Sequence, residues 1–502
     1  MKKFILLMMT AALVALPVLS CAADDGGAVQ NGYDRSSPAE TPIYPGAGDA
    51  NGDTDADAGA EEGLRFPDLP DVNFGGYEFR ILNTRGGAQG HILTMLIPEE
   101  ETGEALHDAM FRRNRRMEER FGFTLVEIGF GAPGGARDSA RTSIQAGSDD
   151  FDLAMMQPIQ ALELAQQGML EMIDMVPHVD LSQPWWDQDM NRDFSIGHRL
   201  FLTSGDFSFN QYSVTTIAFF NKQLHADLGL DCPYTLVNEG RWTLERFAEQ
   251  GRAGNRDLNG DGIMDATDQW GLVSNAQAYA IGFPNGVGAR AIIKDADDMP
   301  VLNINTQGYI ERIMLVFDTL MEGWHMDGAR AHTSGEPRDV FVDGRALFWV
   351  DLMNHAQVLR AVDHDFGILP LPKLNEEQEY HVHGTGVPHV MAIPITTADL
   401  ERTGIILEAL NAESRLTVRD VYFDTMLVNQ IMNRDEESGE MLELIFANRV
   451  YDKGRLFWND QVTQPILQAF RQMNPEIVSI IERNEASANA AIQRTIDAFL
   501  AN

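Results

Sequence analysis

The feature that most constrains the fold is a regular alternation of strand and helix patterns over residues 77–156. Residues 77–82 alternate apolar and polar side chains as a strand does, and residues 105–121 carry apolar side chains at helical spacing. A second strand pattern follows at 123–128, then a helix at 139–146 and a short apolar strand at 151–156. Strands that alternate with helices form a mostly parallel sheet covered by helices on both faces. The sequence therefore predicts an α/β protein that begins with a doubly wound sheet.

The length of the chain predicts more than one lobe. It has 502 residues, whereas a single hydrophobic core stops growing at roughly 250–300 residues. A second set of elements begins with a strand and helix at 215–222, strands recur at 346–350 and 366–369, and the part from 407 onward is mostly helical. We place a first lobe at 75–213 plus about 346–390, and a second at 214–345 plus about 391–502.

The N-terminus has the pattern of an export signal. Two lysines precede an apolar run, so residues 1–20 are predicted to be a signal peptide. The next residue, Cys21, completes a segment that resembles a bacterial lipobox, in which this cysteine receives a lipid anchor; an ordinary signal peptide with a chance cysteine is the alternative. Residues 21–70 are rich in Gly, Ala and Asp and predict a disordered acidic tether. We expect an exported lipoprotein on the extracellular face of the cell membrane, or in the periplasm if the cell has an outer membrane.

The charge and the missing motifs exclude several functions. A formal charge of −37 repels phosphate backbones, so nucleic acid is not an expected partner. The sequence has no G-x-S-x-G, no H-E-x-x-H and no P-loop. We therefore predict a protein without catalytic residues. The alternative is a secreted carbohydrate-active enzyme or a lectin-like surface module, because 75 acidic residues make chance carboxylate pairs common.

Four segments in a fixed order carry a family resemblance: 219–222 (FFNK), 240–243 (GRWT), 341–348 (FVDGRALF) and 366–372 (FGILPLP). They resemble the extracellular solute-binding proteins of carbohydrate ABC transporters, and the resemblance runs from about residue 75 to the end. It implies a two-lobed fold like that of type II periplasmic binding proteins, with mixed sheets and a helical C-terminal part. It also implies that a monomer captures a sugar or oligosaccharide by hinge closure and delivers it to permease subunits.

Candidate ligand-binding residues are aromatic and polar side chains near strand ends and lobe crossings. Sugars present apolar C–H faces to aromatic rings and hydroxyl groups to carboxylates, amides and arginines. Asp351 follows the strand at 346–350, close to Trp349, and the resemblance puts this segment at the cleft. The further candidates precede the first crossing or lie in predicted loops: Asp206, Asn210, Tyr212, Trp185, Trp186 and Trp458. For each tryptophan, packing in the core is the alternative.

Residues 257–268 (DLNGDGIMDATD) follow the pattern of a calcium-binding loop. Alternating oxygen-bearing side chains point inward in such a loop, and a glycine at position 6 allows the turn. The predicted ligands are Asp257, Asn259, Asp261, the backbone carbonyl of Ile263, Asp265 and Asp268. Asp268 departs from the pattern, because a bidentate glutamate is usual there. We predict a structural Ca²⁺ ion, with a solvated turn as the alternative.

Overall fold

The computed structural model describes residues 64–85, 95–131, 134–275, 278–327, 336–383, 388–427 and 436–501. The predicted signal peptide 1–20, the predicted lipidation site Cys21 and residues 21–63 of the predicted tether lie outside the described residues. Within those ranges, no helix is long and apolar enough to cross a membrane.

The first lobe is built on a four-stranded sheet with the order β12-β3-β1-β2. Its strands β1 (Tyr77–Thr84), β2 (Phe123–Phe130) and β3 (Leu153–Met156) are parallel, and β12 (Val390–Ala392) pairs with β3 in the antiparallel direction. The connections are α1 (Ala105–Phe121) and α2 (Gly135–Gln145), and α3 (Pro158–Ala165) follows β3. All four residues of β3 are buried, as expected for a strand with helices on both faces.

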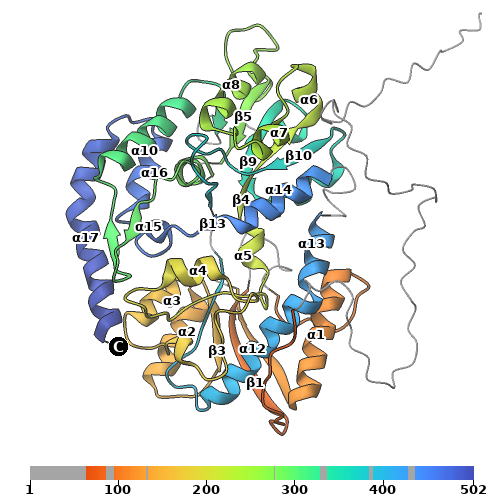
Figure 1. The fold of residues 1–502 in the computed structure, drawn as a ribbon, viewed down its shortest axis with the longest axis vertical. Coiled ribbons are helices and arrows are strands. Elements are labelled where there is room, and N and C mark those ends of the chain that lie inside the picture. The colour runs from red at the N-terminus through yellow and green to blue at the C-terminus, as the bar shows by residue number, and fades with distance from the viewer. Residues whose placement is uncertain are drawn as a thin grey trace, which may run out of the picture. The chain divides into compact units, whose positions relative to one another are not determined.

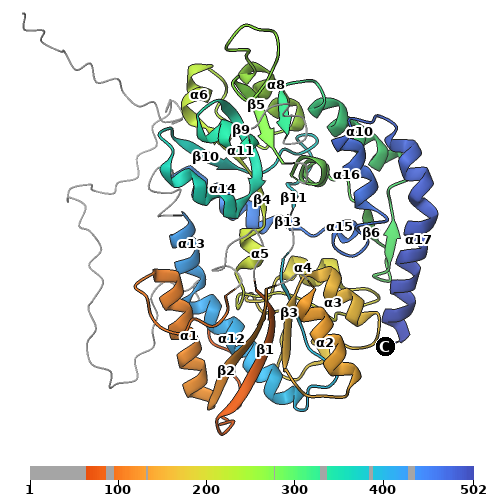
Figure 2. The same ribbon diagram turned by 180° about the vertical axis from the view of Figure 1, so that it is seen from behind.

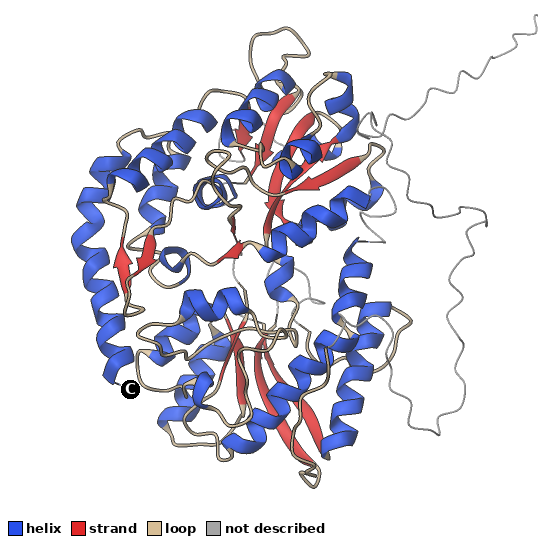
Figure 3. Ribbon diagram, in the orientation of Figure 1, coloured by secondary structure: helices blue, strands red, loops and turns tan. Residues whose placement is uncertain are grey.

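The second lobe is built on a five-stranded mixed sheet with the order β10-β4-β9-β5-β8. Strands β5 (Trp270–Ser274), β8 (His325–Asp327) and β9 (Ala346–Leu352) are parallel. Strand β4 (Thr216–Asn221) lies antiparallel to both β9 and β10 (Phe366–Leu369). Helices surround both sheets (Figures 1 and 3). The prediction of a two-lobed α/β protein is thus confirmed.

The predicted lobe boundaries are wrong in two regions. Residues 346–390 were assigned to the first lobe, but β9 and β10 are central and edge strands of the second sheet. Conversely, β12 joins the first sheet, and α12 (Leu400–Thr417) packs against α1 of the first lobe. Both sheets contain fully buried strands, for example β3 in the first and β10 in the second, so an apolar run does not reveal which sheet a strand joins.

Several segments link the lobes (Figures 1 and 2). Helix α5 (Asn210–Ser213) precedes β4 at the first crossing. Strands β11 (Val382–His383) and β13 (Arg449–Val450) form a separate two-stranded parallel ladder. The long α17 (Ile477–Ala501) packs against α16 (Thr463–Arg471), and its Thr495 accepts a hydrogen bond from Gln166 of the first lobe at 2.6 Å.

The remaining elements complete the two lobes and the C-terminal part: η2 (Ile173–Met175), α4 (Gln188–Phe194), α6 (Lys222–Asp227), α7 (Pro233–Asn238), α8 (Leu244–Gly254), η3 (Ala278–Gly282), α9 (Phe283–Gly286), β6 (Ile292–Lys294), β7 (Pro300–Leu302), α10 (Gln307–Leu320), α11 (Pro337–Val342), η4 (Met353–Ala361), α13 (Arg419–Leu427), α14 (Glu436–Ala447) and α15 (Lys453–Leu456).

Candidate ligand-binding site

The carboxyl ends of β5, β8 and β9 meet at one edge of the second sheet, because these strands are parallel. Polar side chains gather at this edge. Asn275 Nδ2 donates a hydrogen bond to Asp351 Oδ1 at 2.6 Å, and His355 Nδ1 lies 3.0 Å from the same oxygen. Ser274 Oγ lies 2.7 Å from His325 Nε2. The structure therefore places the predicted residue Asp351 where doubly wound sheets bind their ligands.

The predicted residue Trp349 packs into the core beneath this edge. It is buried and stacks on Phe219 of the neighbouring strand β4, with ring centroids 4.9 Å apart. Its ring is also parallel to that of His355, at a centroid distance of 6.5 Å. The aromatic stack thus supports the strand that carries Asp351.

The predicted residues Asp206, Asn210 and Tyr212 come together around α5. The Tyr212 hydroxyl donates to Asp206 Oδ1 at 2.7 Å, and Arg415 Nη1 lies 3.4 Å from Asp206 Oδ2. Asn210 Oδ1 accepts a hydrogen bond from the backbone N–H of His389 at 2.8 Å. All three predicted residues are buried, and burial raises the pKa of Asp206. These polar groups hold two crossing segments together, and their contact with a ligand stays a prediction.

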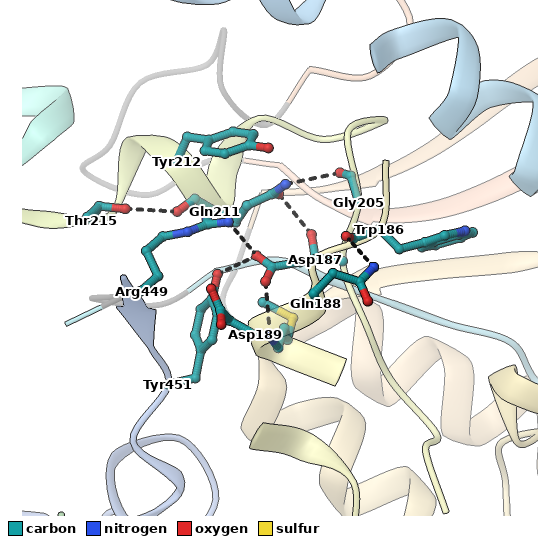
Figure 4. A network of polar contacts seen from close by, with 12 residues as sticks. Trp186, Asp187, Gln188, Asp189, Gly205, Gln211, Tyr212, Thr215, Arg449 and Tyr451 are labelled. Atoms are coloured by element: carbon teal, nitrogen blue, oxygen red, sulfur yellow. Dashed lines mark hydrogen bonds and ion pairs between the residues drawn. The ribbon is translucent and has the colours of Figure 1, made fainter. Parts of the chain in front are cut away.

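A buried ion pair joins α4 to β13 (Figure 4). Asp187 caps α4 by accepting from the Met190 N–H at 2.9 Å, and its Oδ2 lies 3.0 Å from Arg449 Nη2. The Tyr451 hydroxyl donates to the same Oδ2 at 2.6 Å, and the Arg449 guanidinium carbon lies 4.7 Å from the centre of the Tyr212 ring. Arg449 is 6% exposed, and within the described part of the chain its Nε and Nη1 have no hydrogen-bond partner.

Sequence reasoning missed this ion pair. Asp187 and Tyr451 are separated by 264 positions, and no local pattern marks Arg449 as a partner of an aspartate so far away. The one usable signal was Asp187 itself, because aspartate is a favoured N-cap residue and a helical segment follows it.

The predicted residues Trp185 and Trp186 belong to the core of the first lobe. They are 1% and 2% exposed, and their indole N–H groups donate to the two carboxylate oxygens of Glu408 at 3.0 and 2.9 Å. Burial raises the pKa of Glu408 to about 7. The Trp186 ring points away from Asp187 and Arg449 (Figure 4). The pair therefore anchors α12 to the loop before α4, as the core-packing alternative predicted.

A pocket of about 460 Å³ lies at the carboxyl end of β3, where α3 begins. The predicted residue Trp458 is part of its wall, and its indole N–H donates to Thr495 Oγ1 at 3.0 Å. The other lining residues are mostly polar and come from α3, the segment 455–461 and α17: Gln157, Pro158, Ile159, Glu163, Gln166, Arg455, Leu456, Phe457, Asn459, Asp460, Gln461, Ala491 and Arg494. The volume is in the range of small-molecule sites.

The loop 257–268 adopts a tight turn held by its own carboxylates. Asp257 Oδ2 accepts from the Gly262 N–H at 2.9 Å, and Gly262 has a φ of +79°. The buried Asp268 accepts from the Asp265 N–H, also at 2.9 Å. Among the described residues, no three His, Cys, Asp or Glu side chains converge as a metal site. Calcium binding at this loop therefore stays a prediction.

Comparison with known proteins identifies the fold of this chain. No protein-family model matches the sequence, and no curated protein matches it. An ABC substrate-binding protein from Listeria monocytogenes, solved in complex with cycloalternan, matches with a TM-score of 0.53 at 12% identity, over 83% of this chain and 99% of that one. A cyclo/maltodextrin-binding protein complexed with maltotetraose gives 0.53 at 12% identity, over 84% and 96%. UgpB from Mycobacterium tuberculosis, in complex with glycerophosphocholine, gives 0.52 at 15% identity, over 84% and 99%.

These matches cover 96–99% of each solved chain and 83–84% of this one. The protein therefore has the two-lobed fold of periplasmic binding proteins, in which mixed sheets are flanked by helices.

Proposed function

We propose that this protein is the substrate-binding component of an ABC importer, which captures a sugar or oligosaccharide and delivers it to permease subunits unchanged. The observation that carries the proposal is the two-lobed fold, which this chain shares with proteins described as ABC substrate-binding or maltodextrin-binding. A fold alone hosts many functions, so the polar strand ends and the pocket must supply the specific support.

The ligand site that we propose combines the pocket at the end of β3 with the polar edge that carries Asp351. Amides such as Gln157, Gln166 and Asn459 line the pocket and suit sugar hydroxyl groups as donors and acceptors. Phe457 and Trp458 supply apolar wall for C–H groups. Because the two regions belong to different lobes, a ligand that contacts both favours a closed arrangement.

Binding without turnover is the direct test. Calorimetry and thermal unfolding with a panel of mono- and oligosaccharides, with peptides and polyamines as controls, should identify a saccharide that binds and raises the melting temperature. Incubation with labelled oligosaccharides should leave them intact. Steady turnover would favour the alternative, a secreted carbohydrate-active enzyme, whereas binding to no saccharide at all would refute the proposal.

Hinge closure can be measured separately from ligand binding. Small-angle X-ray scattering should show a smaller radius of gyration at saturating ligand than without it. An unchanged radius at saturation would contradict closure on binding.

Membrane attachment is a further part of the proposal and depends on Cys21. We propose that residues 1–20 are removed and that a lipid on Cys21 holds the protein, through the acidic tether, on the extracellular face of the membrane or in the periplasm. Cys21→Ala should move the protein from the membrane fraction to the soluble fraction, and sedimentation of that variant should give a monomer. Retention in the membrane fraction would refute the lipid anchor.

A further inference from the structure

The pocket at the end of β3 contains two arginines without acidic partners. Arg455 lines it from α15 and Arg494 from α17, and neither forms an ion pair with any of the described residues. The chain has 75 acidic residues against 38 lysines and arginines, so carboxylates are plentiful. Two unpaired guanidinium groups at one pocket therefore indicate a role other than a structural ion pair.

Arg455 is held against the pocket wall by its neighbours. Its backbone N–H donates to Asp452 Oδ1 at 3.0 Å, which caps α15, and its Nη1 donates to Asn459 Oδ1 at 2.7 Å. Its Nε is buried and has no hydrogen-bond partner within the described part of the chain. Burial lowers the pKa of Arg455, although Asp452 opposes the shift. The Nε–H group is thus short of an acceptor, and no carboxylate among the described residues forms an ion pair with the guanidinium.

Among the described residues, the acidic side chains of the pocket form no ion pair with either arginine. Glu163 lines the pocket, but its Oε2 lies 2.9 Å from Arg137 Nη1 and 3.3 Å from Arg141 Nη2. Asp460 accepts a hydrogen bond from Asn459 Nδ2 at 3.2 Å and forms no ion pair with a described residue. With Glu163 paired to its own arginines, Asp460 is the lining carboxylate left to face Arg455 and Arg494.

The first turn of α3 adds a positive potential to the pocket. Gln157 is its N-cap residue and Pro158 its first helical residue, and no side chain caps the helix. Helix N-termini carry a partial positive charge that stabilises anions. Gln157, Pro158 and Ile159 line the same pocket as the two arginines.

We propose that this pocket binds an oxyanion carried by the saccharide ligand, a carboxylate or a phosphate ester. The inference rests on the proposed function and narrows it, because it makes an acidic saccharide the ligand class. A guanidinium group matches either oxyanion with two parallel hydrogen bonds. Arg455 provides a fixed contact, whereas the exposed Arg494 provides a second cation at the rim.

The test compares matched ligands on the full chain by calorimetry. The ligands are glucose, glucuronate, glucose 6-phosphate, neutral and uronate-containing disaccharides, and inorganic phosphate. We expect an acidic saccharide to bind about tenfold to a hundredfold more tightly than its neutral counterpart, the range for hydrogen bonds to charged groups. Comparison of uronates with sugar phosphates identifies the oxyanion.

Substitutions of the two arginines then test whether the pocket causes the preference for the acidic saccharide. Arg455→Gln and Arg494→Gln should each remove most of the preference for the acidic saccharide, and far-UV circular dichroism checks that each variant is folded. Arg483→Gln is the matched control, because Arg483 is exposed on the same helix as Arg494 and does not line the pocket. It should leave the preference unchanged.

Three outcomes would overturn the inference. Equal or tighter binding of the neutral saccharides would refute it and leave the proposed function intact. Binding of inorganic phosphate as tightly as the acidic saccharide would show an anion site unrelated to a sugar. Failure of every saccharide, neutral and acidic, would refute the proposed function as well.

Discussion

The substitution Asp187→Asn isolates the charge of the Asp187–Arg449 ion pair from the other roles of the aspartate. Asparagine is as favourable an N-cap as aspartate, so the hydrogen bond from the Met190 N–H is retained. The amide NH₂ group then takes the place of Oδ2, so it donates to the Tyr451 hydroxyl oxygen where the carboxylate accepted from that hydroxyl. The negative charge that lies 3.0 Å from Arg449 Nη2 is lost.

The expected loss follows from the burial of Arg449. Removing one member of a buried ion pair typically lowers the free energy of unfolding by about 3–5 kcal/mol, because the other charge stays buried without compensation. Arg449 is 6% exposed and two of its nitrogens already have no hydrogen-bond partner among the described residues, while Asp189, a second carboxylate that acts on it, already forms an ion pair with Arg192. We therefore expect Asp187→Asn to lower the free energy of unfolding by about 3–5 kcal/mol.

A double-mutant cycle that combines Asp187→Asn with Arg449→Met measures the coupling energy between the two charges. Replacing both charges removes the uncompensated cation, so the double variant should be about 1–3 kcal/mol more stable than the sum of the single losses predicts. Denaturant unfolding followed by tryptophan fluorescence gives the free energies. Glu249→Gln is the control, because it removes one member of the Arg246–Glu249 ion pair, whose side chains are 42% and 61% exposed; it should cost less than about 1 kcal/mol. If Asp187→Asn costs no more than this control, the reasoning fails.

Three further predictions concern other parts of the chain. Burial raises the pKa of Glu408 to about 7 from an ordinary value of 4.5. The native state therefore keeps a proton that the unfolded chain has released, and stability should fall by about 3 kcal/mol as the pH rises through this window. Glu408→Gln should flatten that pH dependence in denaturant unfolding, and an unchanged slope would contradict the assignment. Millimolar calcium should raise the melting temperature through the loop 257–268, an added chelator should lower it, and the absence of any shift would refute the calcium site. A Cβ at Gly271 would lie 1.9 Å from the Gly251 carbonyl oxygen, so Gly271→Ala should lower the free energy of unfolding, by about 1–3 kcal/mol; a loss within error would show that α8 moves aside freely.

Local sequence patterns predicted the secondary structure well where periodicity and capping were strong. The helix predicted at 105–121 has these bounds in α1, and the strand predicted at 366–369 is β10. Thr243, a favoured type of N-cap residue, follows the buried Trp242 and caps α8 by accepting the Arg246 N–H at 3.3 Å. Apolar spacing and side-chain caps act within a few residues of the chain, so a single sequence contains them.

The candidate site was predicted only in part. Asp351 was placed correctly at a strand end, because the end of a buried apolar run is visible in the sequence. Trp185 and Trp186 were named as ligand residues, but the structure puts them in the core on Glu408, more than 200 positions away. Aromatic residues suit cores and sugar sites equally, so composition does not separate the two uses.

The sequence by itself determined the α/β class and most strand and helix positions, because these follow from local periodicity and capping. Four short segments in a fixed order also indicated the two-lobed fold, which this chain shares with the solved structures. Only the tertiary structure decided which sheet β9 and β10 join, which carboxylate neutralises Arg449, and which guanidinium groups stay unpaired at the pocket. Strand partners, ion pairs and pocket walls bring together residues hundreds of positions apart, and such contacts depend on how the lobes pack.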